Sequence, residues 1–251
     1  MPEILMKEVE TGEKVAVSNG IYSKYIKRFF DICCALAALV VFGWLYIIVA
    51  VLVRVKLGSP VIFKQPRPGK DEKIFDIYKF RTMTDERDED GNLLPDDVRL
   101  TKFGRKLRSK SLDELPEAIN ILKGDMSVIG PRPQLVRDMT FMTPKQRLRH
   151  CVRPGLSGLA QTRGRNALSW DNKLETDLEY VENITFIGDV KIIFDTVKQV
   201  FLKEKGIEDS VADEIDITDD FGDYLLKKGR VTKEEYNQKQ AEAKNLIGVR
   251  N

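Results

Sequence analysis

Histidine is almost missing from this chain of 251 residues, in which His150 is the only one. Catalytic triads that use an imidazole base, and metal centres built from several imidazoles, are therefore nearly excluded. His150 stands among arginines in "RHCVRPG", where neighbouring positive charge makes an imidazole a poor base. We expect it to have a structural role.

Cysteine is scarce as well, with Cys33, Cys34 and Cys151 as the only three. Two of them are adjacent and lie inside an apolar run, a spacing that does not suit a disulfide framework. A small secreted protein held together by disulfides is excluded, and a reducing, cytoplasmic setting is favoured.

The chain has little excess of either charge, since its formal net charge is +2. The charges are nevertheless unevenly placed. Lys and Arg are concentrated in residues 102–108 and 145–165, whereas residues 208–223 are acidic and contain no Lys or Arg. The basic stretches are compatible with a nucleic acid, an anionic membrane surface or a phosphorylated substrate.

Charge is absent from Ile32–Val53, an apolar run of 22 residues. As a helix it would be about 33 Å long, which is enough to cross the hydrocarbon core of a bilayer. A buried core helix is the alternative. Basic residues flank the run on both sides, which favours a re-entrant segment that bends near Gly43 and returns to the cytoplasmic face. These flanking residues are Lys24, Lys27, Arg28, Arg54, Lys56, Lys64, Arg67 and Lys70.

Secondary structure elsewhere is predicted from periodicity and turn residues. Two β-like runs, Pro60–Gln65 and Lys73–Thr82, surround "RPGKDEK" and predict a hairpin. Helices are predicted over Leu115–Lys123, Ser169–Val181 and Phe186–Lys203. The last of these carries an apolar stripe, typical either of core packing or of contact with a membrane surface.

These patterns together predict an α+β fold that is mainly helical, with a membrane-inserted N-terminal helix, a small β-hairpin and amphipathic interfacial helices. Four parts are expected: a flexible tail (1–23), the membrane segment (24–58), a cytoplasmic catalytic domain (59–207), and an acidic linker with a short helical appendage (208–251). The appendage is interpreted either as a helical hairpin or as a solvated charged tail.

The adjacent acids Asp113 and Glu114 lie in "SLDELPEAINILKGDMSVIGPRP". Ser111 and Glu114 fit a capping box, so the pair has a purely structural interpretation. Its surroundings favour chemistry instead, because arginines on constrained loops bind phosphate oxygens well. Mg²⁺ binds one or two carboxylates together with phosphates, and a carboxylate can itself attack phosphorus. These arginines are Arg108, Arg132, Arg153, Arg163 and Arg165.

Four stretches in this order closely resemble the bacterial sugar transferases, the monotopic phosphoglycosyl transferases that start glycoconjugate assembly. They are "KRFFD", "FKQPRPGKDEKIFDIYKFRTM", "RSKSLDELPEAINILKGDMSVIGPRP" and "RPGLSGLAQTRGRNALSW". The resemblance extends over residues 24–203. It implies transfer of a sugar-1-phosphate from a UDP-sugar to polyprenyl (undecaprenyl) phosphate, with release of UMP, at the cytoplasmic face of the bacterial inner membrane.

The resemblance also implies roles for particular residues. Asp113 would be the nucleophile of a ping-pong mechanism through a covalent phospho-sugar, and Asp113 and Glu114 would hold Mg²⁺. Arg108 would meet the polyprenyl phosphate, and the remaining substrate-binding positions would be Lys79, Arg132, Arg165 and Asp189. The family's membrane segment is a re-entrant helix, commonly broken by Ser-Pro, where this chain has Gly43-Trp44.

Other functions are left open by the residues alone. A membrane-anchored scaffold without catalysis would use the acid pair as a cap, and a phosphatase would need no lipid acceptor. Binding to nucleic acid is disfavoured by the apolar run and the small net charge. The stretch "GRNALSW" is similar to that of members using N-acetylated amino sugars such as di-N-acetylbacillosamine. Membrane lipids are expected partners, and a homo-oligomer is possible.

Overall fold

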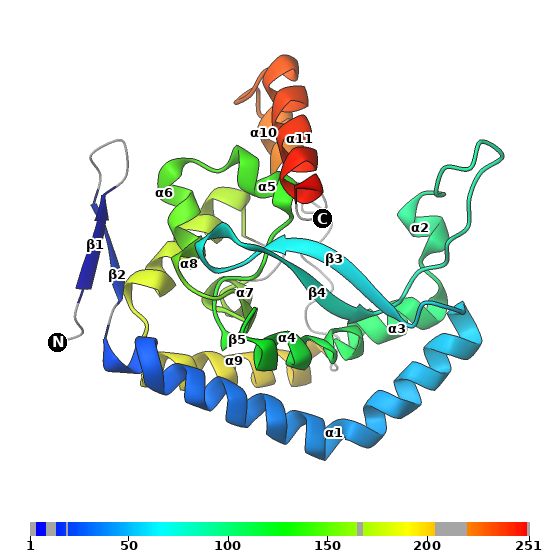
Figure 1. The fold of residues 1–251 in the computed structure, drawn as a ribbon, viewed down its shortest axis with the longest axis horizontal. Helices are drawn as coiled ribbons and strands as arrows, with labels where there is room; N and C mark the ends of the chain where they lie inside the picture. The colour runs from blue at the N-terminus through cyan, green and yellow to red at the C-terminus, as the bar shows by residue number, and fades with distance from the viewer. Residues whose placement is uncertain (1–3, 9–13, 19, 165–167, 204–219, 250–251) are drawn as a thin grey trace. The chain divides into compact units, whose positions relative to one another are not determined.

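The computed structural model describes residues 4–8, 14–18, 20–164, 168–203 and 220–249. The fold is mostly helical with a few short strands, which confirms the predicted class (Figure 1). The chain forms two compact units, each assembled from segments distant in sequence. Unit 1 comprises Met1–Asp31, Pro66–Phe75 and Gly124–Asn251, and unit 2 comprises Ile32–Gln65 and Asp76–Lys123.

The apolar run forms α1 (Lys27–Leu57), which follows the short helix η1 (Tyr22–Ile26). Helix α1 starts in unit 1 and continues through unit 2. Only 11% of its most apolar 18-residue window is buried, whereas the core helix of a soluble protein is mostly buried. The alternative of a core helix is therefore disfavoured. Large apolar side chains are exposed along it at Val40, Val41, Phe42, Trp44, Ile47, Ile48, Val51 and Val55.

The predicted hairpin is confirmed. Strands β3 (Ile62–Pro68) and β4 (Ile74–Phe80) pair and are joined through the turn η2 (Lys70–Glu72). Unit 2 continues through α2 (Asp96–Arg99), α3 (Lys102–Ser109), η3 (Leu112–Glu114) and α4 (Glu117–Lys123). Its buried core consists of Val49 and Val53 of α1, Phe80 of β4 and Leu107 of α3.

Local sequence signals explain the ends of α3 and α4. The Thr101 hydroxyl caps α3 by accepting a hydrogen bond from the Gly104 amide at 3.0 Å. Gly104 is required because a Cβ there would lie 1.8 Å from the carbonyl oxygen of Thr82. Helix α4 ends before Gly124, which takes a φ of 93° and stops the helix in the predicted place.

Unit 1 contains a two-stranded parallel sheet and a series of helices. The strands are β5 (Ser127–Ile129) and β6 (Gly155–Ser157). The helices are α5 (Val136–Phe141), α6 (Pro144–Arg147), η4 (Leu148–Cys151), α7 (Leu159–Thr162), α8 (Trp170–Glu182) and α9 (Phe186–Lys203). One cluster of its core unites Ile129, Tyr180, Ile184 and Ile192.

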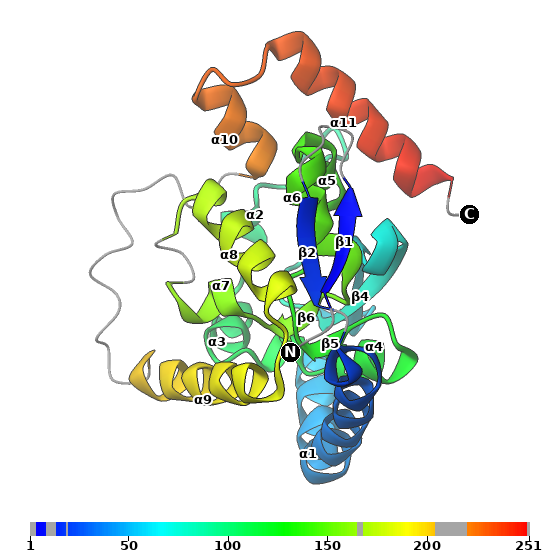
Figure 2. The ribbon, with the colours of Figure 1, turned by 90° about the vertical axis from the view of Figure 1, so that its left-hand side faces the viewer.

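The N-terminal stretch expected to be a flexible tail contains two strands instead. Strand β1 (Ile4–Glu8) pairs antiparallel with β2 (Lys14–Ser18), and Figure 2 shows them side by side. Val17 is buried, and the hydroxyl of Ser18 donates a hydrogen bond to the carbonyl oxygen of Ile184. Two runs of five residues are too short for sequence periodicity to identify them as strands. Their pairing and their contact with the rest of unit 1 stabilise them.

Helix α9 has the predicted bounds but buries a different face from its apolar stripe. Asp189 and Ile192 are buried, and Thr196 bonds the hydroxyl of Ser157 at 2.6 Å. Most of the stripe is exposed, at Phe186, Ile187, Ile193 and Val197. The core interpretation of the stripe is therefore wrong for these positions, and its contact with a membrane surface stays a prediction.

The C-terminal stretch forms two helices, α10 (Phe221–Lys227) and α11 (Lys233–Gly248), drawn as a hairpin in Figure 2. Phe221 and Leu225 of α10 enter a buried cluster of unit 1 that also contains Phe141, Met142, Trp170 and Leu174. The buried carboxylate of Asp138 accepts hydrogen bonds from the amides of Leu135 and Phe221. These two helices are packed, so the alternative of a solvated tail is wrong for residues 220–249; residues 208–219 of the predicted linker lie outside the described residues.

Candidate functional site

The acid pair does not form the helix cap that its sequence suggests. Asp113 and Glu114 lie in η3, and Ser111 precedes them with a φ of 53° in the left-handed region. The hydroxyl of Ser111 makes no capping hydrogen bond, and only its carbonyl oxygen accepts one, from the Glu114 amide. The capping-box interpretation is therefore wrong, because the left-handed backbone turns Ser111 away from the amides it would cap.

Glu114 is bound instead to Lys79, a predicted site residue on β4. The ammonium of Lys79 donates a hydrogen bond to Oε1 of Glu114 at 2.8 Å, and both side chains are 17% exposed. The structure thus brings together Lys79, Glu114 and Asp113, three of the residues that the motifs single out. Lys79 sits where a substrate phosphate could share its positive charge with the acids.

Glu117 also belongs to this group and was missed by the sequence reasoning. Its Oε1 lies 3.2 Å from Nζ of Lys79, and its side chain is 3% exposed. One signal was available, since Glu117 follows Asp113 by four residues and Glu114 by three, the spacing that places helical side chains on one face. The proline between them hid this pattern, because it interrupts the helix between η3 and α4.

Asn120 fixes the position of α4 against β4 through two backbone groups that precede Lys79 in the strand. Its side-chain oxygen accepts a hydrogen bond from the Tyr78 amide at 2.9 Å, and its amide nitrogen donates to the carbonyl oxygen of Asp76 at 2.7 Å. Asn120 is completely buried, where such bonds are strong and costly to lose. These two hydrogen bonds therefore fix α4, which carries Glu117, next to the strand that carries Lys79.

Arg108, at the end of α3, is held by a neighbouring hydroxyl. Its Nε donates a hydrogen bond to Oγ1 of Thr82 at 3.0 Å. This contact leaves the guanidinium with further donors, since the group carries five N–H bonds. The positive charge of Arg108 opposes, in small part, the rise in the pKa of Asp113 that burial causes.

Burial dominates the electrostatics of Asp113, which is 7% exposed. Burial raises the pKa of the Asp113 carboxyl above its usual value, and the neighbouring charge of Glu114 raises it further. Lys79, a backbone hydrogen bond and Arg108 oppose this without overcoming it. These surroundings therefore favour the neutral form of Asp113 more than water does.

The donors at this site fit a hard cation such as Mg²⁺. The described residues include no group of three or more His, Cys, Asp and Glu side chains that could hold a metal unaided. Mg²⁺ does not need one, because it usually takes one or two carboxylates and completes its shell with water and substrate phosphates. Asp113 and Glu114 could supply such carboxylates, and the excess of acids over Lys79 favours a cation there.

Arg132 lies in unit 1, in the Pro-Arg-Pro motif, where two consecutive carbonyl oxygens accept hydrogen bonds from other arginines. Nη2 of Arg149 donates a hydrogen bond to the carbonyl oxygen of Arg132 at 2.6 Å, and Arg67 donates to that of Pro133 at 3.2 Å. Arg149 also bonds the buried carboxylate of Asp177 at 2.7 Å. These buried contacts, with two prolines, fix the course of the loop.

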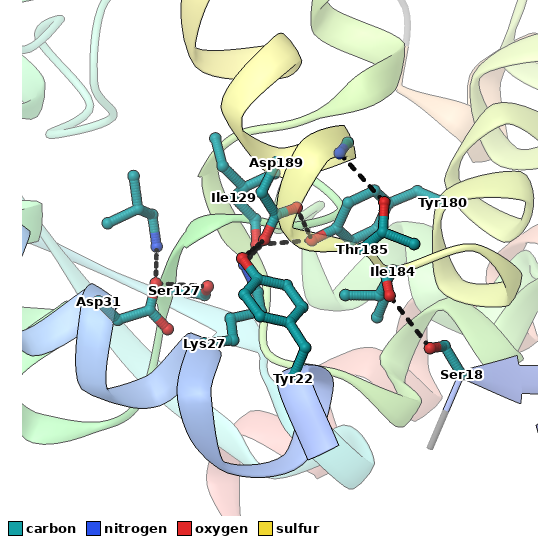
Figure 3. A network of polar contacts seen from close by, with 12 residues as sticks. Ser18, Tyr22, Lys27, Asp31, Ser127, Ile129, Tyr180, Ile184, Thr185 and Asp189 are labelled. Atoms are coloured by element: carbon teal, nitrogen blue, oxygen red, sulfur yellow. Dashed lines mark hydrogen bonds and ion pairs between the residues drawn. The ribbon is translucent and has the colours of Figure 1, made fainter. Parts of the chain in front are cut away.

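Asp189 also lies in unit 1, in a network at the start of α1 that Figure 3 shows. Its carboxylate accepts hydrogen bonds from Lys27 at 2.7 Å, from Tyr22 at 2.7 Å and from Tyr180 at 2.9 Å. Burial, and then Asp189, raise the pKa of Tyr180 well above its usual value, which keeps it a proton donor.

The other arginines of the motifs are distributed differently. Arg153 donates a hydrogen bond to the carbonyl oxygen of Gly124 at 2.8 Å, and Arg163 pairs with the exposed Glu179. Arg165 lies outside the described residues. Neither of these two contacts involves Asp113 or Glu114, so the expected role of Arg153 and Arg163 in binding phosphate stays a prediction.

Comparison with known proteins places these residues in a wider context. The family described as "Bacterial sugar transferase" matches residues 22–203. The uncharacterized sugar transferase EpsL of Bacillus subtilis is 52% identical over 179 residues, which cover 71% of this chain and 89% of that protein.

Two relatives carry the names of reactions. The UDP-N-acetylgalactosamine-undecaprenyl-phosphate N-acetylgalactosaminephosphotransferase of Aeromonas hydrophila is 39% identical, over 72% of this chain and 45% of that protein. The UDP-glucose:undecaprenyl-phosphate glucose-1-phosphate transferase of Klebsiella pneumoniae is 37% identical, over 74% of this chain and 42% of that protein. The match therefore spans less than half the length of these two proteins.

Proposed function

The chain belongs to the bacterial sugar transferase family, and on this premise we propose that it transfers a sugar-1-phosphate from a UDP-sugar to undecaprenyl phosphate and releases UMP. The reactions named for two relatives support both the donor class and the acceptor. The observation that carries the proposal is the state of the acid pair, in which Asp113 is buried beside Glu114 and neither caps a helix.

The reaction proceeds in two displacements at the phosphorus next to the sugar. An oxygen of Asp113 attacks that phosphorus, the bond to the bridging oxygen breaks, and UMP leaves with that oxygen and its electron pair. An oxygen of undecaprenyl phosphate then attacks the same phosphorus and displaces the Asp113 carboxylate. The product is undecaprenyl-diphosphate sugar, and the two polyanions visit the site in turn.

The charged residues of unit 2 fit this sequence of steps. Lys79 and Arg108 offset the charge of the phosphates, and Glu114 with Asp113 would hold Mg²⁺. When bound, Mg²⁺ would neutralise the diphosphate and the acids together and keep Asp113 in its ionised form. Burial raises the pKa of the Asp113 carboxyl, and a bound cation would oppose that rise.

A re-entrant course of α1 is supported by contacts at both of its ends. Near its start, Asp31 accepts hydrogen bonds from the hydroxyl of Ser127 and the amide of Val128, both at 2.8 Å. In its second half, the hydroxyl of Tyr46 donates to the carbonyl oxygen of Leu115. Residues 115 and 127 are about a dozen positions apart, and the charged stretch that joins them cannot lie in hydrocarbon.

Both ends of α1 would therefore face the same, cytoplasmic side of the inner membrane. Figure 1 draws α1 as one helix with a bend along its length. Gly43 has no atom within 4 Å of a Cβ built on it, so it imposes no packing constraint there. The exposed apolar face of α9 would contact the bilayer surface.

The sugar is proposed to be an N-acetylated amino sugar, with UDP-di-N-acetylbacillosamine as one candidate. Two observations support this class: the similarity of "GRNALSW", of which residues 165–167 lie outside the described residues, and the N-acetylgalactosamine named for the Aeromonas relative. Transfer of this kind would be the first membrane step in making an exopolysaccharide or a related glycoconjugate.

The deciding experiment measures UMP release by the purified protein in nanodiscs, across a panel of UDP-sugars with Mg²⁺ and undecaprenyl phosphate. We expect one N-acetylated donor to be clearly preferred and UMP release to need the lipid for repeated turnover. A scaffold protein would release no UMP with any donor, and a phosphatase would release phosphate or free sugar phosphate without the lipid.

The covalent step is tested by omitting the lipid. The enzyme should then release at most about one UMP per site and gain the mass of one sugar phosphate on the peptide that contains Asp113. Turnover without any such adduct in quenched samples would contradict the two-displacement mechanism while leaving the overall reaction intact.

A further inference from the structure

Glu117 is a buried carboxylate for which the reaction described above has no task. A buried charge is costly unless it is paired, and Glu117 is paired with Lys79 at 3.2 Å. Lys79 is at the same time hydrogen-bonded to Glu114 at 2.8 Å. One ammonium group therefore serves two carboxylates, and one of these is the proposed metal-holding residue.

This sharing has a consequence when a metal ion binds. The Oε1 atom of Glu114 that accepts from Lys79 would be drawn toward the cation, because a carboxylate oxygen interacts more strongly with a divalent ion than with an ammonium. Lys79 would then lose one partner. Glu117 lies on the first turn of α4, whose position against β4 is fixed by Asn120, so it remains in place as the second partner.

We propose that Glu117 is a positioning residue that retains Lys79 in the site while Glu114 is released to Mg²⁺. The inference rests on the proposed function and adds a role to a residue outside the predicted site. Lys79 keeps its place beside Asp113, where the phosphates of the donor arrive. Without Glu117, each binding of Mg²⁺ would leave Lys79 without either of the two glutamates that pair with it.

The test is Glu117→Gln, which keeps the shape of the side chain and removes its charge. Lys79 should then compete more strongly for Glu114, so the Mg²⁺ concentration for half-maximal UMP release should rise about tenfold, the low end for residues that orient a metal ligand. Mn²⁺ binding in the presence of UMP, measured by electron paramagnetic resonance, should weaken by a similar factor and does not depend on turnover.

A matched control is Asp138→Asn, which replaces another acid that is 2% exposed, in unit 1. This change should lower the melting temperature without changing the dependence on Mg²⁺ or Mn²⁺. An unchanged metal dependence in Glu117→Gln, with only a lower melting temperature, would overturn the proposal and leave Glu117 a structural residue.

A double-mutant cycle with Lys79→Met separates positioning from direct metal binding. If Glu117 acts through Lys79, Glu117→Gln should have no further effect on Mn²⁺ binding in the Lys79→Met background. An equal loss in both backgrounds would make Glu117 a ligand and overturn the proposal. A parent enzyme that releases no UMP would instead contradict the proposed function itself.

Discussion

Asp113 in unit 2 and Asp189 in unit 1 are both buried acids singled out by the sequence, yet their surroundings are opposite. Asp189 accepts three hydrogen bonds, from Lys27, Tyr22 and Tyr180. Asp113 has an acid beside it, and its burial raises the pKa of its carboxyl. A carboxylate that accepts several hydrogen bonds stabilises a fold. A buried carboxylate with a second acid beside it favours binding of a cation, and such groups are common at reactive sites.

The type of residue that a motif contains therefore does not by itself reveal the role of that residue in the folded protein. Asp189 on α9 accepts a hydrogen bond from Lys27 at the start of α1, so it links these two segments within unit 1. Asp113 contributes little to stability in its ionised form. Substitutions at the two positions should therefore have opposite effects on activity and on stability.

The largest expected effect is on activity, from Asp113→Asn. Loss of the nucleophile should lower turnover by about 10⁴-fold or more, as when other covalent nucleophiles are removed, and should abolish the adduct. The free energy of unfolding should stay the same or rise by about 1 kcal/mol, because a neutral side chain avoids the cost of burying a charge. Steady-state kinetics and melting temperatures in nanodiscs measure both, and a folded variant with near-parental turnover would refute the covalent mechanism.

The reverse pattern is expected for Asp189→Asn. Removing this charge leaves the half-buried ammonium of Lys27 without its anionic partner, which should cost about 3 kcal/mol of stability. Melting temperatures measure the loss, and adduct formation per folded molecule should persist. Tyr180→Phe is the milder control, expected to cost about 1 kcal/mol. A stable Asp189→Asn protein with no adduct would instead return Asp189 to the substrate site.

Glu72 in unit 1 extends the comparison to a half-buried acid, whose neighbours outweigh the effect of burial on its pKa. Burial raises the pKa of its carboxyl, but hydrogen bonds from Arg147 and the imidazole of His150, whose Nδ1 lies 3.6 Å away, lower it to about 2. Stabilisation from Glu72 is therefore complete above its usual pKa of 4.5 and is lost as pH falls from 4.5 toward 2.

Glu72→Gln should accordingly lower the free energy of unfolding at pH 7 by about 2 kcal/mol, allowing for partial exposure of the pair. The gap between variant and parent should narrow between pH 4.5 and pH 3 in melting experiments. Burial lowers the pKa of His150 below its usual value, so its imidazole is neutral at pH 7 and does not change the free energy of unfolding near that pH. A gap that is constant over this range would contradict the assignment.

The smallest effect is expected for Ser111→Gly, which tests whether the acid pair caps a helix. Loss of a capping hydroxyl would cost only a few tenths of a kcal/mol with Gly and about 1 kcal/mol with Ala. Because Ser111 has a φ of 53° and makes no capping bond, Gly should be neutral or stabilising by up to about 1 kcal/mol. The melting temperature of the Gly variant should therefore equal or exceed that of the parent, whereas loss of a capping hydroxyl would place it below the parent.

Much of the secondary structure could be predicted, because its signals are local. The hairpin of β3 and β4 has turn residues between two β-like runs, and α4 and α9 have clear ends or periodicity. Strands β1 and β2 were missed because five-residue runs carry too little pattern. The acid pair was found through its arginines and through family resemblance, whereas Glu117 was found only once its contact with Lys79 was visible.

The sequence by itself determined the class of this protein: an uncharged run long enough for a membrane, an acid pair beside arginines, and family motifs over residues 24–203. Tertiary structure alone decided which groups surround each acid. Asp189 accepts three hydrogen bonds, Asp113 has an acid beside it, and Glu117 shares Lys79 with Glu114. The physical reason is that the free energy of a carboxylate depends on its burial and on donors far away in sequence, such as Lys27 for Asp189.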